Sequence, residues 1–306
     1  MERVLVTGGA GFIGTNLIPR LVADDRYTVT VLDNMTNVSG DLEPSDHIEI
    51  VEGDIRDINI VDRVVKDTDV IVHLAAHTRV MDSIEDPALN FDINVQGTFN
   101  VLESMRRKGV KRIVNASTGG AILGEVPPPV HEEMAAKPAS PYGASKLAAE
   151  GYCSAYAQSY GLSAVSLRFS NLYGPHSRNK GSVVARFIKD ILNKGEVTVY
   201  GDGSQTRDFL HVEDLVDGID KAIDKRVSGV FQLGQGEPNS VNDVIEIARS
   251  VVDVDFKVKF EEFRPGEIRH TYCDISKAEK AFAYAPNLTL EEGFKKTWSW
   301  FLRDGT

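Results

Sequence analysis

The sequence predicts a doubly wound α/β fold, in which helices cover both faces of a parallel sheet, followed by a smaller α/β domain. Apolar runs typical of buried parallel strands alternate with amphipathic helical stretches through the first half of the 306-residue chain. Beyond about residue 170 the alternation gives way to shorter elements separated by glycine-rich turns. We therefore expect one domain over residues 1–170 and a second, mainly separate domain over residues 171–306.

The individual elements follow from the apolar spacing. Strands are predicted at Arg3–Thr7, Thr28–Asp33, Ile48–Glu52, Val70–Leu74, Lys111–Ser117 and Ala164–Phe169. Helices are predicted between them at Ile13–Ala23, Ile58–Val65, Asn90–Lys108 and Pro141–Tyr160, and right-handed crossovers place these on both faces of one sheet. In the second domain we expect helices at Gly181–Asn193, Val212–Ile223, Val241–Val251 and Leu290–Phe301. Gly229–Leu233 is expected to return to the main sheet.

Composition excludes several classes of protein. Lys plus Arg number 34 against 45 Asp plus Glu, and the net charge of −11 disfavours nucleic-acid binding. The basic run at residues 106–112 is interpreted as a helix C-terminus ended by Gly109. No apolar run is long enough to span a membrane, and the start of the chain resembles a strand and not a targeting leader. Cys153 and Cys273 are far apart, which fits a reducing cytoplasm, and neither the cysteines nor the histidines have metal-site spacing.

The strongest local pattern is the turn after the first strand, where residues 7–14 read TGGAGFIG. Glycines at Gly8, Gly11 and Gly14 permit a tight turn and let a pyrophosphate approach the free N–H groups of the following helix. Asp33 ends the next strand, where a carboxylate can accept hydrogen bonds from the ribose hydroxyls. Because its charge would repel a 2′-phosphate, the sequence predicts a Rossmann-type site that prefers NAD to NADP.

A second pattern is Tyr142-Gly143-Ala144-Ser145-Lys146, at the start of a helix that Pro141 opens. The four-residue spacing places Tyr142 and Lys146 on one helical face. Since a nearby ammonium favours the phenolate, we expect Lys146 to lower the pKa of Tyr142. Tyr142 is then a candidate general base that takes a hydroxyl proton during hydride transfer.

In this order the motifs resemble those of extended short-chain dehydrogenases/reductases, namely the NAD-dependent sugar-nucleotide epimerase/dehydratase family and its UDP-glucose 4-epimerase-like members. The resemblance runs nearly end to end. It implies an NAD-binding first domain and a sugar-nucleotide-binding second domain. The NAD contacts that it implies are Gly8, Gly11, Phe12, Ile13, Gly14, Asp33, Asn34, Asp54, Ile55, Leu74, Ala75, Ala76, Asn94, Tyr142, Lys146 and Phe169. The substrate contacts that it implies are Thr78, Asn171, Arg207, Arg264 and Thr271.

The resemblance also implies a first step in which NAD oxidises C4 of the sugar. Dehydratases of the family carry an Asp–Glu pair directly after the catalytic Ser/Thr, whereas residues 117–124 here read STGGAILG. Glycine cannot transfer a proton, so elimination lacks its acid and base, and C4 epimerisation of UDP-glucose/UDP-galactose is expected. Thr118 is assigned as the catalytic hydroxyl with Ser117 in reserve, and Leu123 stands where many members have Tyr.

Sugar choice and assembly are implied less directly. Thr271 aligns with a position where a bulky aromatic restricts the C2 substituent, so the N-acetylhexosamine pair is expected to fit as well. Arg178 and Lys180 are interpreted as solvated loop charges, with contact to a uronic acid or a phosphate as the alternative. His77 either borders the substrate or is an ordinary loop histidine. The family implies a homodimer formed through helices near Asn94–Met105 and Tyr142–Tyr160.

Two other functions remain open on the sequence. One is a different NAD-dependent nucleotide-sugar conversion, such as dehydration, uronic acid epimerisation or 4-keto reduction. The other is a non-catalytic nucleotide-binding regulator, a class that commonly lacks the Tyr–Lys pair or the glycine turn. Both patterns are present in this chain.

Overall fold

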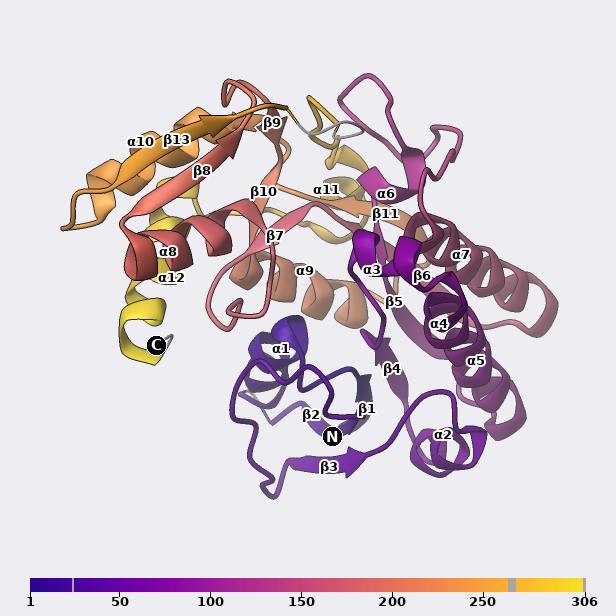
Figure 1. Ribbon diagram of the computed structural model, residues 1–306. Helices are drawn as coiled ribbons and strands as arrows, with labels where there is room; N and C mark the ends of the chain where they lie inside the picture. The colour runs from indigo at the N-terminus through magenta and orange to yellow at the C-terminus, as the bar shows by residue number, and fades with distance from the viewer. Residues whose placement is uncertain (24, 264–267, 305–306) are drawn as a thin grey trace.

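The computed structural model describes residues 1–23, 25–263 and 268–304 (Figure 1). Its centre is a seven-stranded sheet of order β11-β6-β5-β4-β1-β2-β3, in which every adjacent pair is parallel. The strands are β1 (Glu2–Thr7), β2 (Tyr27–Asp33), β3 (Ile48–Glu52), β4 (Val70–His73), β5 (Arg112–Thr118), β6 (Ser163–Phe169) and β11 (Gly229–Leu233). The predicted doubly wound α/β class is confirmed, and each of the six N-terminal strands lies within one residue of its predicted bounds.

Helices cover both faces of this sheet, because strands that are apolar on both sides need cover on both (Figure 1). One face carries α1 (Phe12–Val22), α9 (Val212–Asp224) and α11 (Ser276–Phe282). The other carries α2 (Ile58–Val65), α5 (Gly97–Lys108) and α7 (Pro141–Tyr160). Leu17, Ile219 and Phe282 are buried together on the first face, and Val101 and Met105 are buried on the second.

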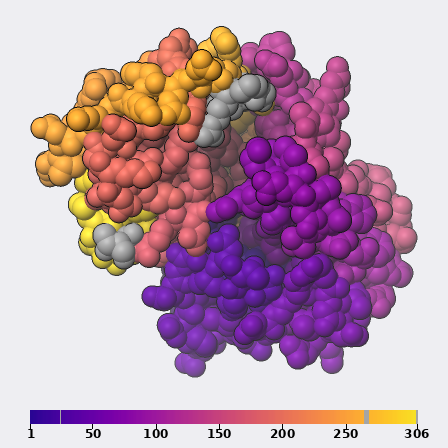
Figure 2. Space-filling model, in the orientation of Figure 1, coloured from indigo at the N-terminus to yellow at the C-terminus, as the bar shows by residue number. Residues whose placement is uncertain are grey.

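The second half of the chain has its own core. Short strands pair there as β7 (Asn171–Tyr173) with β10 (Phe209–His211), β8 (Glu196–Tyr200) with β13 (Lys257–Glu261), and β9 (Thr206–Arg207) with β12 (Asn239–Ser240). The helices α8 (Val183–Lys194), α10 (Val241–Val251) and α12 (Leu290–Asp304) pack around them. Figure 2 shows the surface hollowed between this half and the sheet half.

One predicted helix is interrupted. The stretch expected as a single helix over Asn90–Lys108 consists of α4 (Pro87–Phe91), a π-helical turn η1 (Asp92–Gln96) and α5. Two helices too short for a periodic signal, α3 (Val80–Glu85) and α6 (Gly120–Leu123), follow the ends of β4 and β5. The basic run at residues 106–112 begins at the end of α5, where Gly109 is left-handed at φ 79°. Arg106 pairs with Glu103 and Arg107 with Asp62, as expected for an ordinary helix end.

None of the described helices combines the length and the apolar character needed to cross a membrane.

Candidate active site

The glycine turn after β1 is shaped for close approach of a ligand. Gly8 has φ +70°, and a Cβ there would lie 2.6 Å from the Ala75 backbone nitrogen. A Cβ on Gly14 would lie 2.3 Å from the Gly9 carbonyl oxygen, so α1 packs directly on the turn. Gly11 is the N-cap of α1 and has no side chain to cap the first-turn N–H groups. These N–H groups, beginning with Phe12, therefore suit a phosphate group, as the dinucleotide motif requires.

The ends of β2 and β3 place two carboxylates beside this turn. Asp33 accepts hydrogen bonds from the backbone N–H groups of Ala10 (3.0 Å) and Met35 (2.9 Å), which fix its carboxylate. Asp54 accepts a two-pronged contact from the Arg56 guanidinium at 2.9 and 2.8 Å, and Asn34 donates to it at 3.1 Å. The Arg56 contact lowers the pKa of Asp54 to about 2, so this carboxylate is ionised over the working pH range.

Behind the turn, His73 at the end of β4 joins three elements. Its ring nitrogens hydrogen-bond the hydroxyls of Thr7 on β1 (2.7 Å) and Thr98 on α5 (3.0 Å). Burial lowers the pKa of His73 to about 3, so the imidazole is neutral. No separate role was predicted for His73, although a polar residue that ends a wholly apolar strand was a usable signal. The half-buried Leu74–Ala76 segment that follows is held at the same edge.

Asn94, an expected NAD contact, lies in the π-helical turn and anchors the loop after β4. Its amide oxygen accepts from the His77 N–H at 2.7 Å, and its amide nitrogen donates to the His77 carbonyl at 3.0 Å. The same nitrogen donates to the Ser145 hydroxyl on α7 at 2.9 Å. A π turn exposes such contacts by shifting the helix register, and it often occurs at functional sites. Asn94 thus connects the NAD edge to the helix that carries Tyr142.

The Tyr142–Lys146 pair is positioned by the start of α7. Ser140 caps the helix by accepting from the Gly143 N–H at 3.2 Å, and Pro141 is its first residue. The Lys146 ammonium donates to the Ala116 carbonyl at 2.9 Å; burial lowers its pKa to about 8, while Glu150 opposes that shift. Burial raises the pKa of Tyr142 to about 12. The expected lowering is therefore absent in the protein itself, because the Lys146 ammonium is directed at the β5 backbone.

Thr118 and Ser117, the two candidate catalytic hydroxyls, are separated by the alternation of side chains along β5. Thr118 is half-buried at the end of the strand. Ser117 is buried and donates to the Glu150 carboxylate at 2.6 Å. That carboxylate also accepts from Arg168 at 2.9 and 2.8 Å, forming an ion pair with both side chains nearly fully buried. The reserve assignment of Ser117 is thus not supported, because its hydroxyl is part of a buried network.

The Glu150–Arg168 pair was not identified from the sequence. Glu150 follows Lys146 by four residues and Arg168 immediately precedes Phe169 at the end of β6, but nothing in this spacing pairs the two side chains. Glu150 lies on α7, the helix that carries Tyr142 and Lys146, and Arg168 lies on β6. Phe169 itself is buried at the strand end, level with Thr118 in the sheet register.

The segment after β5 contains no carboxylate, but one approaches from the following loop. A Cβ on Gly119 would lie 2.7 Å from the Gln232 side-chain oxygen. Glu132 accepts from the Gln232 backbone N–H at 2.7 Å and so lies near the same edge. Leu123 is fully buried against Val130 and Cys273. Position 123 is therefore a core position here, so its side chain is not presented to the site.

On the substrate side, Arg207 and Thr271 are brought together around Thr206. Arg207 donates to the Thr206 carbonyl at 2.9 Å and to the Arg269 carbonyl at 3.1 Å. The Thr271 N–H donates to the same Thr206 carbonyl at 3.2 Å. Asn171 and Thr78 are exposed, on β7 and after the Asn94-anchored loop respectively. Arg264 lies outside the described residues.

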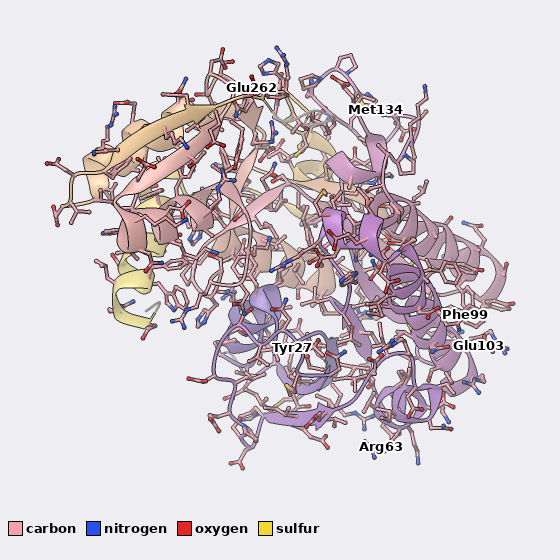
Figure 3. All side chains as sticks on the ribbon, viewed as in Figure 1. Tyr27, Arg63, Phe99, Glu103, Met134 and Glu262 are labelled. Atoms are coloured by element: carbon pink, nitrogen blue, oxygen red, sulfur yellow. The ribbon has the colours of Figure 1, made fainter. Side chains whose placement is uncertain are left out.

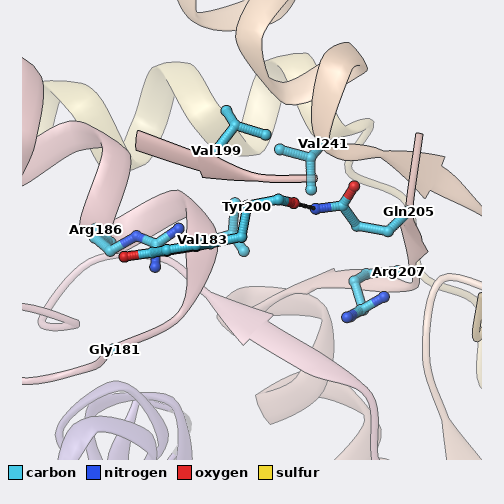
Figure 4. Close-up of a pocket in the computed structure, with 8 residues that line it drawn as sticks. All are labelled: Gly181, Val183, Arg186, Val199, Tyr200, Gln205, Arg207 and Val241. Carbon is cyan, nitrogen blue, oxygen red and sulfur yellow. Dashed lines mark hydrogen bonds between the residues drawn. The ribbon is translucent and has the colours of Figure 1, made fainter. Parts of the chain in front are cut away.

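A cavity of about 120 Å³ lies beside Arg207 (Figure 4). The Arg186 guanidinium lies 5.5 Å from the centre of the Tyr200 ring. Gln205 donates to the Tyr200 carbonyl at 2.7 Å, but its own side-chain oxygen is buried without a partner, as is the Nε of Arg186. The lining residues are Gly181, Val183, Arg186, Val199, Tyr200, Gln205, Arg207 and Val241.

No group of three or more His, Cys, Asp or Glu suited to a metal ion occurs among the residues that the structure describes.

A doubly wound sheet with a glycine turn, a ribose-side carboxylate and a buried Tyr–Lys helix defines a nucleotide-binding enzyme of the dehydrogenase/reductase type. The model of the NAD dependent epimerase/dehydratase family matches residues 4–234, and the chain belongs to this family. The cofactor is accordingly NAD. The residues fit it, since the glycine turn admits a pyrophosphate and Asp33 is fixed to receive the ribose.

Individual relatives are similar over the whole chain. A UDP-glucose 4-epimerase of Mycolicibacterium smegmatis is 35% identical over 307 residues, covering 98% of each chain. The crystal structure of a Thermus thermophilus UDP-glucose 4-epimerase with NAD has a TM-score of 0.91 and 35% identity, covering 99% of this chain and all of that one. A UDP-N-acetylglucosamine 4-epimerase from Methanobrevibacter ruminantium has a TM-score of 0.92 and 32% identity, covering 98% of each.

Proposed function

We propose that the protein catalyses NAD-dependent C4 epimerisation of a UDP-linked hexose. The observation that carries this is the composition of the catalytic edge. Tyr142 and Lys146 lie on α7, Thr118 ends β5, and α6 follows with residues 119–123 free of any acid or base. Such a site can remove and return one hydroxyl proton, but the segment after β5 offers no pair of groups for elimination at C5 and C6.

In the proposed reaction Tyr142 takes the C4 hydroxyl proton and later returns one. Bound NAD would supply the hydride acceptor for oxidation at C4 and, in its reduced form, the hydride donor for the return step. Thr118 donates to or accepts from the same sugar oxygen, and Lys146, one helical turn from Tyr142, is held by its bond to the Ala116 carbonyl. Because burial alone raises the pKa of Tyr142, positive charge near the phenol is needed to make it an effective base.

We propose that residues 1–170 hold NAD and that residues 171–306 mainly hold the nucleotide sugar. Arg207 offers a planar guanidinium suited to phosphate oxygens, and Asn171 and Arg264 are proposed as further diphosphate contacts. The 120 Å³ cavity beside Arg207 is proposed to receive the base of the nucleotide. The unpartnered polar atoms of Arg186 and Gln205 are proposed to hydrogen-bond that base. Thr271, next to this cluster, is small, which supports acceptance of an N-acetyl group as well as a hydroxyl at C2.

The test is to incubate the purified protein with a panel of UDP-hexoses, UDP-N-acetylhexosamines and UDP-uronic acids and to identify products by NMR. Interconversion of UDP-glucose and UDP-galactose with no net change in NAD absorbance supports the proposal. A 4-keto-6-deoxy product or net NADH formation would contradict it. The uronic acid arm tests the second candidate, which relatives named UDP-glucuronate 4-epimerase favour.

We also propose a homodimer located in the cytoplasm. Both cysteines are buried and free, which fits a reducing compartment. Phe91 on α4 and Tyr152 on α7 are large apolar side chains that are about half exposed, and the ring of Phe99 on α5 lies 5.8 Å from that of Tyr152. Figure 3 labels Phe99 and Glu103 on the outer side of α5. Sedimentation of the wild type and of Tyr152→Glu tests the dimer, since the variant is expected to be monomeric.

A further inference from the structure

The loop after β7, residues 174–182, is called the strap below because it leaves the substrate half and lies on the NAD half. Asn16 on α1 donates to the Pro175 carbonyl at 3.1 Å. Asn179 donates to the Val38 carbonyl at 3.0 Å, and Arg79 donates to the Asn179 carbonyl at 3.3 Å. Figure 1 shows the strap descending from β7 toward α1. It is thus hydrogen-bonded to three segments around the glycine turn.

Lys180 is the cation that the strap brings to this turn. Its ammonium lies 4.9 Å from the centre of the Phe12 ring, and Phe12 is the first residue of α1. Burial lowers the pKa of Lys180 to about 8, with no carboxylate opposing the shift. Among the described residues, no hydrogen-bond acceptor or acidic partner contacts its Nζ. Lys180 is half-buried against Phe12, so it is more enclosed than the solvated loop charge that the sequence suggested.

Lys180 is half-buried, and an ammonium held over an aromatic ring with no anion beside it is suited to a ligand that supplies negative charge. One further feature points to an anion at the same place, and another lies in the same strap. The uncapped first turn of α1 offers N–H groups and the positive end of the helix dipole. The hydroxyl of Ser177, fully buried in the strap, also has no partner. The cation and the helix N-terminus together suit the oxygens of a phosphate group.

We propose that Lys180 binds the pyrophosphate of NAD, so that the strap closes the cofactor site from the substrate half. The inference rests on NAD binding at the glycine turn and not on which sugar is converted. The strap links β7 to α8, so any ligand that fixes the substrate half also fixes Lys180. Binding of NAD and of nucleotide sugar is therefore positively coupled through the strap, and by linkage the coupling is reciprocal.

The test measures the dissociation constants of NAD, adenosine and UDP by calorimetry on full-length protein freed of bound nucleotide. Lys180→Met is expected to weaken NAD roughly 10- to 100-fold, the range for loss of one charge-assisted hydrogen bond. Adenosine, which lacks phosphate, and UDP, which is bound elsewhere, are expected to change by less than about twofold. Lys180→Arg should recover most of the NAD affinity, because it restores the charge. Lys295→Met, which removes an exposed lysine paired with Glu291, is the matched control.

A second readout separates binding from a structural role. If Lys180 served only to hold the strap, Lys180→Met would lower the melting temperature of the NAD-free protein. Removal of a half-buried cation with no anionic partner should instead leave that temperature unchanged or raise it, while reducing the stabilisation that added NAD gives. Unchanged NAD affinity in Lys180→Met would overturn the proposal. So would a loss confined to UDP, which would assign Lys180 to the diphosphate of the substrate. Lys180→Gln repeats the test if the methionine variant does not fold.

Discussion

The carboxyl edge of the seven-stranded sheet and the cavity of the substrate half differ in how their polar side chains are held. At the sheet edge, His73 bonds Thr7 and Thr98, and Glu150 bonds Ser117 and Arg168, so most of these polar atoms have partners within the protein, the Nη1 of Arg168 being an exception. In the cavity, buried polar atoms of Arg186 and Gln205 have no partner. Satisfied buried networks are rigid, whereas unpartnered atoms in a cavity are available to a ligand. We infer that the polar side chains at the sheet edge are in place before substrate binds. The polar atoms of the cavity, in contrast, gain their partners from the bound nucleotide.

The largest expected effect comes from removing the proposed base, Tyr142, from the carboxyl edge of the sheet. Tyr142→Phe should lower kcat for C4 inversion by roughly 10³-fold or more, the range for loss of a general base. The affinity for NAD should change little, because the other cofactor contacts remain. Product formation by NMR and NAD titration measure the two quantities. Tyr152→Phe, on the exposed side of the same helix, is the matched control. Retained inversion in Tyr142→Phe would show that another group is the base.

The second prediction disrupts the buried Glu150–Arg168 ion pair, which involves the helix that carries Tyr142. Glu150→Gln leaves the Arg168 charge buried and unpaired, which should lower the free energy of unfolding by about 3 kcal/mol. Adding Arg168→Met should recover much of this loss, because the unpaired charge is then gone. Urea unfolding of the single and double variants measures both effects. A loss below about 1 kcal/mol in Glu150→Gln would mean that the network is not rigid.

The same contrast explains how much could be predicted from the sequence. Residues such as Asp33 and Thr118 end parallel strands, and parallel strands bring their carboxyl ends to one edge, so the sequence pattern was enough to place them. The role of His73 and the Glu150–Arg168 pair depend on which side chains meet across three or more elements. That information is not carried by periodicity.

The substrate half was less predictable for a different reason. Its pairs, such as β9 with β12, are only two residues long, too short to carry a strand pattern. Arg186 was not identified because a charged residue on a helix is ordinarily solvated. Its contact with Tyr200 depends on the packing of α8 against β8, which is a tertiary property. The contact of Lys180 with Phe12 could not be predicted for the same reason, since it depends on the strap reaching α1.

A third prediction uses pH to test whether His73 is buried and neutral at the sheet edge. The pKa of His73 is about 3 in the folded protein, below the ordinary value of 6.5, so only the unfolded chain binds a proton between these values. The unfolded state then gains as pH falls, and stability should drop by about 2 kcal/mol between pH 6.5 and 5 from this group. His73→Asn should flatten that slope. Unfolding free energies at pH 7 and pH 5 measure it, and equal slopes in both proteins would contradict the assignment.

The smallest predicted effect concerns the cavity beside Arg207. Arg207→Lys keeps the charge but loses the planar fork, so we expect KM for the nucleotide sugar to rise by about tenfold. Its kcat should be nearly unchanged, because Arg207 lies on β9, away from the strand end that carries Thr118. Initial-rate kinetics on the substrate identified by NMR separate the two constants. Arg269→Lys is the control, since Arg269 contacts Arg207 through its backbone carbonyl, which the substitution keeps. A fall in kcat instead of a rise in KM would mean that the substrate half also positions the reacting groups. The distinction between polar groups held within the sheet edge and polar groups completed by the ligand would then not hold.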